Sequence, residues 1–166
     1  MFRRRSSISY FRNFIFGVED SLVSTVGLLS GLAAAEMSKE VIFLTGMVLI
    51  FVEAFSMGAG SLLAESSAEE YSTGVNRISR PDIFSALIMF VSYFASGFIP
   101  LSAYLFLPVG TALTYSIVFS LAALFILGLI GARISGANPL KNGLRIVCIG
   151  GIAIFLGYFV GTALAV

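Results

Sequence analysis

The chain has 166 residues and a net charge of +1; 58% of its residues are hydrophobic and only 11% are charged. A soluble domain of this size needs more polar surface, so the composition predicts an integral membrane protein. The chain contains no His and a single Cys, which excludes imidazole metal sites, His-based catalytic triads and an internal disulfide. The near-neutral charge also argues against a nucleic-acid partner.

Residues 1–16, MFRRRSSISYFRNFIF, are basic at the start and lack a small-residue cleavage site after their apolar run. They therefore predict a retained cytoplasmic arm, not a cleaved signal peptide. Residues 6–16 have two interpretations: an amphipathic helix lying on the inner leaflet, or a frayed arm whose charges only set orientation. In the first, the apolar face holds Ile8, Phe11 and Ile15, and the residues that reach lipid phosphates are Arg3, Arg4, Arg5 and Arg12.

Five segments have the roughly 20 apolar residues that a helix needs to cross a bilayer. They are residues 14–35, 40–64, 83–107, 109–132 and 143–165, each bounded to within a few residues. Only the connection at 65–82 is long and charged, and we expect it to form a short cytoplasmic loop. The sequence thus predicts an all-α membrane protein whose residues 1–166 form a single transmembrane domain of five helices.

The basic residues predict the orientation, because Lys and Arg accumulate on the cytoplasmic side. With the N-terminus in the cytoplasm, nine of the ten basic residues share that side, and only Lys39 lies opposite. The nine are Arg3, Arg4, Arg5, Arg12, Arg77, Arg80, Arg133, Lys141 and Arg145. We therefore expect the N-terminus inside and the C-terminus outside.

Three carboxylates lie inside the predicted spans, away from the span ends: Glu19, Asp20 and Glu53. An unpaired charge in hydrocarbon is costly, so such residues usually face the bundle interior and mark ion or substrate paths. No Lys or Arg lies deep in a span to neutralise them. A proton or a bound cation would do so, and these two possibilities together predict a cation transporter coupled to protons.

Side chains that can bind a cation recur every four residues in the second span and just after it, which places them along one slowly drifting helix face. They are Glu53, Met57, Ser61, Glu65 and Glu69. A Met thioether is a soft ligand that favours transition metals over Mg²⁺ or Ca²⁺, although a lone Met more often serves packing. For Glu65 and Glu69 the alternatives are a solvated helix end and a weak metal-attracting role. We carry all but Ser61 forward as metal candidates.

The first span supplies the opposing wall, through Asp20 and the residues that follow it on the same face. Glu19 points about 100° away from Asp20 on a helix, so the two cannot face one site. We choose Asp20 as the second metal and proton residue. Glu19 is expected at the head-group level or in a subunit interface.

Small residues predict where helices approach closely. GxxxG patterns occur at Gly27 and Gly31 in the first span and at Gly157 and Gly161 in the fifth. Pro100 is expected to kink the third span, a common feature where a path needs room.

Four stretches together resemble the vacuolar iron transporter family over nearly the whole chain. They are GVEDSLVSTVGLLSGLAAA (17–35), VEAFSMGAG (52–60), SGFIPLSAYLF (96–106) and LGLIGARISGANPLKNGLRIVCIGGIAIFLGYFVG (127–161). The resemblance implies a five-helix homodimer that moves Fe²⁺, and sometimes Mn²⁺, out of the cytosol in exchange for protons. It implies a path near the subunit interface, lined by the first two helices, with Asp20, Glu53 and Met57 at the positions of the family's metal residues. The metal is the transported substrate, and no permanently bound cofactor is expected.

Two departures from the family pattern leave other functions open. Ser61 stands where family members often have Glu, and residues 65–82 are far too short for the long metal-binding domain of well-known members. The alternatives are a non-transporting membrane scaffold that keeps the fold, and a transporter of another cation. An enzyme is not expected, because no phosphate-cradling loop occurs and Cys148 lies in an apolar segment where packing is its ordinary role. The small size and the lack of a targeting extension favour a prokaryotic plasma membrane.

Overall fold

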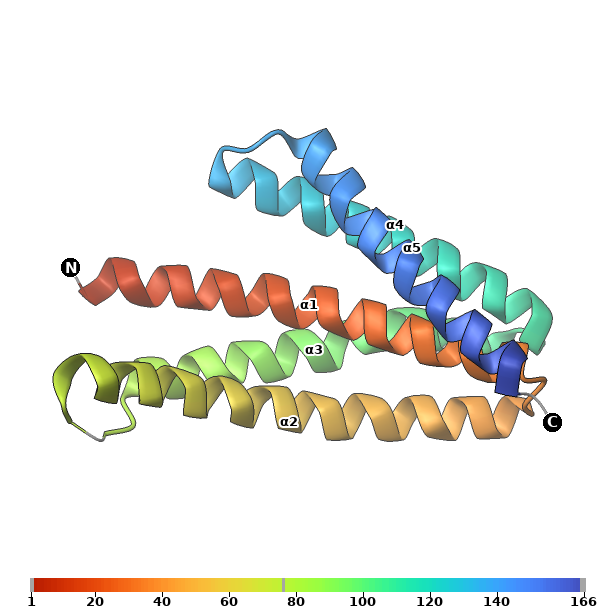
Figure 1. The fold of residues 1–166 in the computed structure, drawn as a ribbon, viewed down its shortest axis with the longest axis horizontal. Helices are drawn as coiled ribbons and strands as arrows, with labels where there is room; N and C mark the ends of the chain where they lie inside the picture. Colours follow the sequence, from red (N-terminus) through yellow and green to blue (C-terminus); the bar gives the residue numbers. More distant parts are fainter. Residues whose placement is uncertain (1, 76, 165–166) are drawn as a thin grey trace.

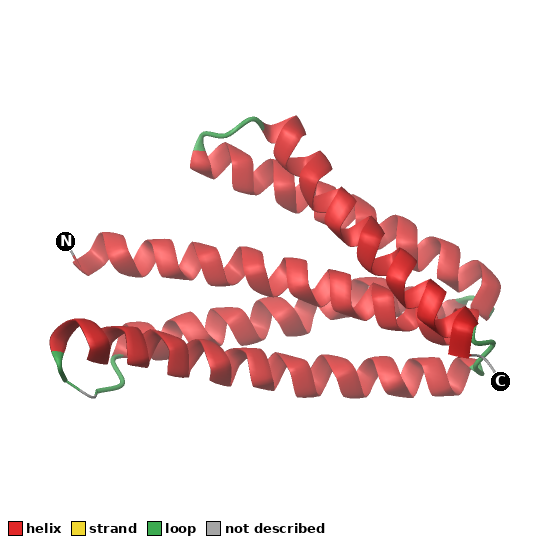
Figure 2. Ribbon diagram, viewed as in Figure 1, coloured by secondary structure: helices red, strands yellow, loops and turns green. Residues whose placement is uncertain are grey.

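The computed structural model describes residues 2–75 and 77–164, with side chains described from Ser7 onward. The described residues form five α-helices joined by short turns (Figure 2). The helices are α1 (Phe2–Ala34), α2 (Lys39–Thr73), α3 (Arg80–Phe106), α4 (Val109–Ser135) and α5 (Pro139–Leu164). All five are long and apolar enough to cross a membrane, which confirms the predicted helical membrane fold.

Local sequence signals set the ends of these helices. The Ser38 hydroxyl accepts a hydrogen bond from the backbone N–H of Val41 at the start of α2 (3.4 Å). The Asp82 carboxylate accepts one from the N–H of Ser79 at the start of α3 (2.8 Å). Helices α2 and α4 end at Gly74 and Gly136, whose φ angles of 71° and 72° are available to Gly at little cost.

Helices α1 and α2 are longer than the predicted spans. They contain 33 and 35 residues, so each is about 50 Å long, well beyond the roughly 30 Å of a hydrocarbon core. Helix α1 begins at Phe2, and α2 continues through residues 65–73, where we expected a loop; only 74–79 connect α2 to α3. Both helices project past the α4–α5 turn in Figure 1.

The described part of the N-terminal arm is therefore the beginning of α1, neither a separate helix on the leaflet nor a frayed end. Its polar residues Ser9 and Arg12 contact Glu65 on the extended part of α2, so each extension gives the other its partners. The side chains of Arg3, Arg4 and Arg5, predicted to meet lipid phosphates, lie outside the described residues.

Helix α1 packs against all four other helices, and α3 packs against α1, α2 and α4. Helices α1, α3 and α5 run in one direction and α2 and α4 in the other, with the two termini at opposite ends (Figure 1). Helix α3 packs closely against both α1 and α2, whereas α1 and α2 touch each other only sparsely. A buried cluster from these three helices and α4 fills the interior; it includes Leu29, Ile42, Ile50, Leu101 and Tyr104.

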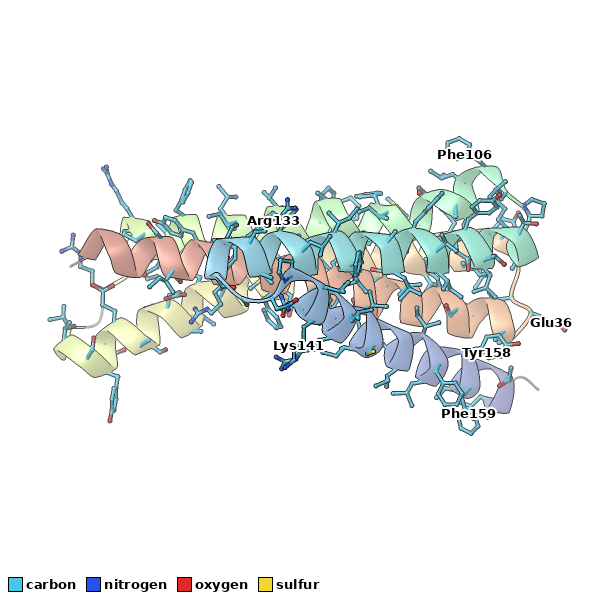
Figure 3. All side chains as sticks on the ribbon, turned by 90° about the horizontal axis from the view of Figure 1, so that it is seen from above. Glu36, Phe106, Arg133, Lys141, Tyr158 and Phe159 are labelled. Atoms are coloured by element: carbon cyan, nitrogen blue, oxygen red, sulfur yellow. The ribbon has the colours of Figure 1, made fainter. Side chains whose placement is uncertain are left out.

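The outer surface is apolar and suits lipid. Large hydrophobic side chains such as Phe55, Phe106 and Phe155 are more than half exposed. Figure 3 shows Phe106, Tyr158 and Phe159 projecting outward near the α1–α2 turn, and Arg133 and Lys141 farther from that end. The sidedness predicted from the basic residues stays a prediction.

Helices α1 and α5 cross through the two predicted glycine pairs. A Cβ added to Gly157 would collide with the carbonyl oxygen of Gly27, and one added to Gly161 would collide with that of Gly31. The glycines thus serve contact between helices of the same chain. Pro100 is buried within α3 and cannot donate the backbone hydrogen bond expected at its position; the kink itself stays a prediction.

Replacing Gly157 with Ala should lower the free energy of unfolding by about 1–3 kcal/mol, because the methyl group has no room against Gly27. The matched control is Gly151→Ala on the same helix, where an added Cβ meets nothing within 4 Å. The control should be neutral or stabilising by up to about 1 kcal/mol, because Ala has the better helix propensity. SDS-titrated unfolding of the purified protein in mixed micelles measures both, and equal effects would contradict the proposed packing.

Candidate functional site

The structure brings Asp20 and Glu53 to the same depth of the bundle. Asp20 lies 14 residues before Ala34 on α1, and Glu53 lies 14 residues after Lys39 on the antiparallel α2. Both are therefore about 21 Å from the same end. Each is partly buried, and the two carboxylates are close enough for their charges to interact. They form a pair of acidic groups within the membrane-spanning part.

Tyr93 of α3 lies in the same layer as Asp20 and Glu53. It is fully buried, and its hydroxyl oxygen lies 2.8 Å from Ser24 Oγ on α1. Its backbone carbonyl accepts a hydrogen bond from Ser21 Oγ (2.6 Å). Tyr93 is also close enough to Asp20 and Glu53 for electrostatic interaction. A buried hydroxyl group that is hydrogen-bonded to α1 therefore lies in the same layer as the two carboxylates.

The sequence analysis missed Tyr93, although a signal for it exists. The stretch SYFAS at 92–96 places three hydroxyl side chains inside an apolar run. Such polar groups need partners in a membrane, so they indicate a face turned toward other helices.

Met57 lies one helical turn beyond Glu53 and is partly buried. Its spacing keeps it on the face of α2 that carries Glu53. Whether Met57 packs or binds metal stays open, and the ligand role is a prediction.

Glu19 lies toward a different neighbour from Asp20. It is partly buried and close enough to Arg145, the seventh residue of α5, for their opposite charges to attract. This interaction within the chain was not expected, because the sequence analysis placed Glu19 at the head-group level or in a subunit interface. The predicted angular separation of Glu19 from Asp20 on the helix is consistent with this different neighbour.

Glu65 and Glu69 cannot bind the same ion as Glu53. Because α2 is helical throughout, Glu65 lies about 18 Å and Glu69 about 24 Å along the axis from Glu53. Metal–oxygen bonds are only about 2.0–2.6 Å long. Glu65 instead pairs with Arg12 and accepts a hydrogen bond from Ser9. A metal ion bound by Glu65 or Glu69 would therefore be a different ion from one bound by Asp20 and Glu53.

Ser61 belongs to a second polar layer, two turns from Glu53. Its hydroxyl accepts a hydrogen bond from the Asn13 side-chain amide of α1 (2.7 Å). The same amide donates to Ser85 Oγ of α3 (2.6 Å). A neutral hydrogen-bonded cluster therefore occupies the position of the carboxylate expected from the family pattern. Asn13, which the sequence analysis treated as part of the arm, is 3% exposed.

Two carboxylates from one chain make an incomplete metal site. Across residues 2–75 and 77–164, no three His, Cys, Asp or Glu side chains lie close enough together to hold a metal ion. The ligands available around Asp20 and Glu53 are hydroxyl groups and, one turn away, a thioether. Further ligands for a metal ion would have to come from water bound to that ion or from a second chain.

Comparison with known proteins gives consistent matches. Residues 11–83 and 72–162 match the VIT family. The chain is 27% identical to "Vacuolar iron transporter 1" of Arabidopsis thaliana over 202 residues, covering 86% of this chain and 81% of that protein. It is 24% identical to "Vacuolar iron transporter 1" of Tulipa gesneriana over 212 residues, covering 92% and 86%. "Vacuolar iron transporter" of Centaurea cyanus is 37% identical over 70 residues, covering 42% and 29%.

The first two alignments are longer than the chain, so these relatives contain residues that have no counterpart here. The two family matches overlap at residues 72–83, around the short α2–α3 turn.

Tyr93→Phe should lower the free energy of unfolding by about 0.6 kcal/mol, the average for a hydrogen bond between membrane helices. The matched control is Tyr104→Phe on the same helix. The Tyr104 hydroxyl is equally buried but has no hydrogen-bond partner among the described residues, so its removal should be neutral or stabilising. SDS-titrated unfolding compares the two, and a greater loss for Tyr104→Phe would contradict the assigned Ser24–Tyr93 bond.

Proposed function

The chain belongs to the VIT family, and on that premise we propose that it exports Fe²⁺, or a similar divalent transition metal such as Mn²⁺, from the cytosol in exchange for protons. The observation that carries the proposal is the Asp20–Glu53 pair, two carboxylates from different helices at one depth within the membrane. The names of the relatives, which are iron transporters, support iron as the first metal to test.

The charge of the pair explains how one site can exchange a metal for protons. Two like charges in a medium of low dielectric repel each other, so the empty pair favours any ligand that removes the repulsion. One divalent cation neutralises both carboxylates, and so do two protons. Binding of protons therefore competes with binding of metal, and a proton supply on one side favours metal release there.

Met57 supports a preference for transition metals. A thioether one turn from Glu53 adds a soft ligand to a set of hard oxygen ligands, and soft ligands discriminate against Mg²⁺ and Ca²⁺. In the proposed path Asp20 and Glu53 supply the charge, and Met57 supplies the selectivity.

A homodimer would complete the site. Asp20 and Glu53 remain partly exposed in the single chain, at a depth where lipid would otherwise meet them. A second copy related by a two-fold axis would present the same surface, cover the carboxylates and add a second pair.

A second candidate function is a membrane scaffold that retains the fold without transport. The observation that favours it is the Asn13–Ser61 hydrogen bond, which replaces an expected carboxylate with a neutral contact. A transporter of another cation is the third. The prokaryotic plasma membrane stays a prediction, while the relatives are plant proteins named for the vacuole.

Glu53→Gln should abolish Fe²⁺ uptake into proteoliposomes driven by a proton gradient, because the amide can neither balance the metal's charge nor exchange a proton. A decrease of at least about tenfold is expected, equivalent to about 1.4 kcal/mol. The matched control is Glu19→Gln, an acidic residue of the same span that lies near Arg145 and not at the site. It should retain most of the uptake.

Size-exclusion chromatography checks that both variants keep the oligomeric state of the parent protein. Full transport by Glu53→Gln would contradict the assignment of Glu53. A well-folded parent that moves neither Fe²⁺ nor Mn²⁺ would favour the scaffold, and competition among Fe²⁺, Mn²⁺, Co²⁺, Zn²⁺ and Ca²⁺ would identify another cation.

A further inference from the structure

We propose that a polar cluster at the N-terminal end of the bundle is the gate that controls access from that side to the Asp20–Glu53 pair. We call it the polar latch; its members are Ser9, Arg12, Asn13, Ser61, Glu65 and Ser85. The inference rests on the proposed function, because a gate has a role only where an ion passes.

The latch lies between the N-terminal end of the bundle and the carboxylate pair. Asn13 precedes Asp20 by seven residues, two turns or about 10 Å, and therefore lies on a similar face of α1. Ser61 follows Glu53 by eight residues, about 12 Å along α2, and Glu65 follows one turn later. An ion that moves along the facing sides of α1 and α2 from this end must pass the latch before it reaches the pair.

The latch connects two helices that otherwise touch little. Helices α1 and α2 make few contacts with each other; α2 packs mainly on α3, and α1 packs on both α3 and α5. At the latch, the buried Asn13 amide donates to Ser61 of α2 and to Ser85 of α3 at the same time. Ser9 Oγ lies 3.1 Å from Ser85 Oγ and donates to Glu65. Polar contacts therefore join α1 to α2 at this end.

The Arg12–Glu65 ion pair of the latch is arranged so that another cation can displace Arg12 from Glu65. The Arg12 side chain is 65% exposed, whereas the Glu65 side chain with which it pairs is 20% exposed. An ion pair whose cation is so exposed is weakly held. A divalent cation that approaches Glu65 carries twice the charge of Arg12 and competes for the same carboxylate. Its binding would release Arg12 and Ser9, leaving the Asn13–Ser61 hydrogen bond as the latch contact that joins α1 to α2.

Arg12 and Asn13 are thus positioning residues of the path. Arg12 keeps Glu65 neutralised until a cation arrives, and Asn13 keeps the two helices together until they part. Neither residue needs to touch the ion at its binding site.

The first test cross-links α1 to α2 at the latch. In a Cys148→Ser background, Cys residues replace Asn13 and Ser61, and a short bis-methanethiosulfonate reagent joins them through bonds that a reductant cleaves. Fe²⁺ uptake into proteoliposomes should fall to the level of protein-free liposomes after cross-linking and should return after reduction. Undiminished uptake by the cross-linked protein would overturn the gate.

The matched control ties α1 to α3 at the same end. Tyr10 and Phe84 lie outside the latch with their ring centroids 5.1 Å apart, and a cross-linked Cys pair at these positions should leave uptake intact. Equal loss in both pairs would overturn the proposal, because the effect would then not depend on separation of α1 from α2.

A second measurement keeps the gate testable even if the parent moves no metal. In the same background, a single Cys at Ser24 reports whether water reaches the Asp20 layer. Asn13→Ala should accelerate its labelling by a cationic, membrane-impermeant methanethiosulfonate added at the N-terminal side. Unchanged labelling would overturn the gate, whereas accelerated labelling without any metal transport by the parent would retain the gate and overturn the proposed function.

Discussion

The structure depends on how two carboxylates are kept in the membrane-spanning part of the chain. Asp20 and Glu53 come from antiparallel helices that hardly touch, so a third helix has to hold them at a common depth. Helix α3 does this because it can come close to both. At Gly97 of α3, an added Cβ would lie 2.7 Å from Ile50 of α2 and 3.0 Å from Ser21 of α1. The missing side chain lets α3 sit between the two acidic helices, and Tyr93 then reaches the layer of the carboxylates.

The five spans were predictable because hydropathy is a local property that needs no knowledge of neighbours. The lengths of α1 and α2 were not. Residues 65–73 are polar and lie before a turn, so they were expected in a loop, although Ala and Glu also favour helix. What extends α2 is contact with α1, where Ser9 and Arg12 supply partners for Glu65. Such contacts between distant segments cannot be seen in the sequence of either helix alone.

The same distinction applies to the site. Asp20 and Glu53 were predictable as candidates because a carboxylate in an apolar run is conspicuous, and helix phase alone separated Asp20 from Glu19. Tyr93 and Asn13 were not, because a Tyr or an Asn near a membrane span has several ordinary roles. Their roles follow from the register between helices, which places Tyr93 beside Ser24 and Asn13 between Ser61 and Ser85. Register is set by packing, including the glycine contacts, and not by any single segment.

The register between the helices also explains the effect of Ser61 on the distribution of charge, which comparison with the family pattern did not. From the N-terminal end inward, Arg12 balances Glu65, the layer of Asn13, Ser61 and Ser85 is neutral, and only then do two unbalanced carboxylates follow. A Glu at 61 would add a third negative charge about 12 Å along α2 from Glu53. With Ser61, the unbalanced negative charge between α1 and α2 is confined to the Asp20–Glu53 layer, where one divalent cation would balance it. Under the proposed function, the departure at Ser61 therefore leaves a site whose charge a single divalent ion balances, and the proposed gate lies in a neutral layer.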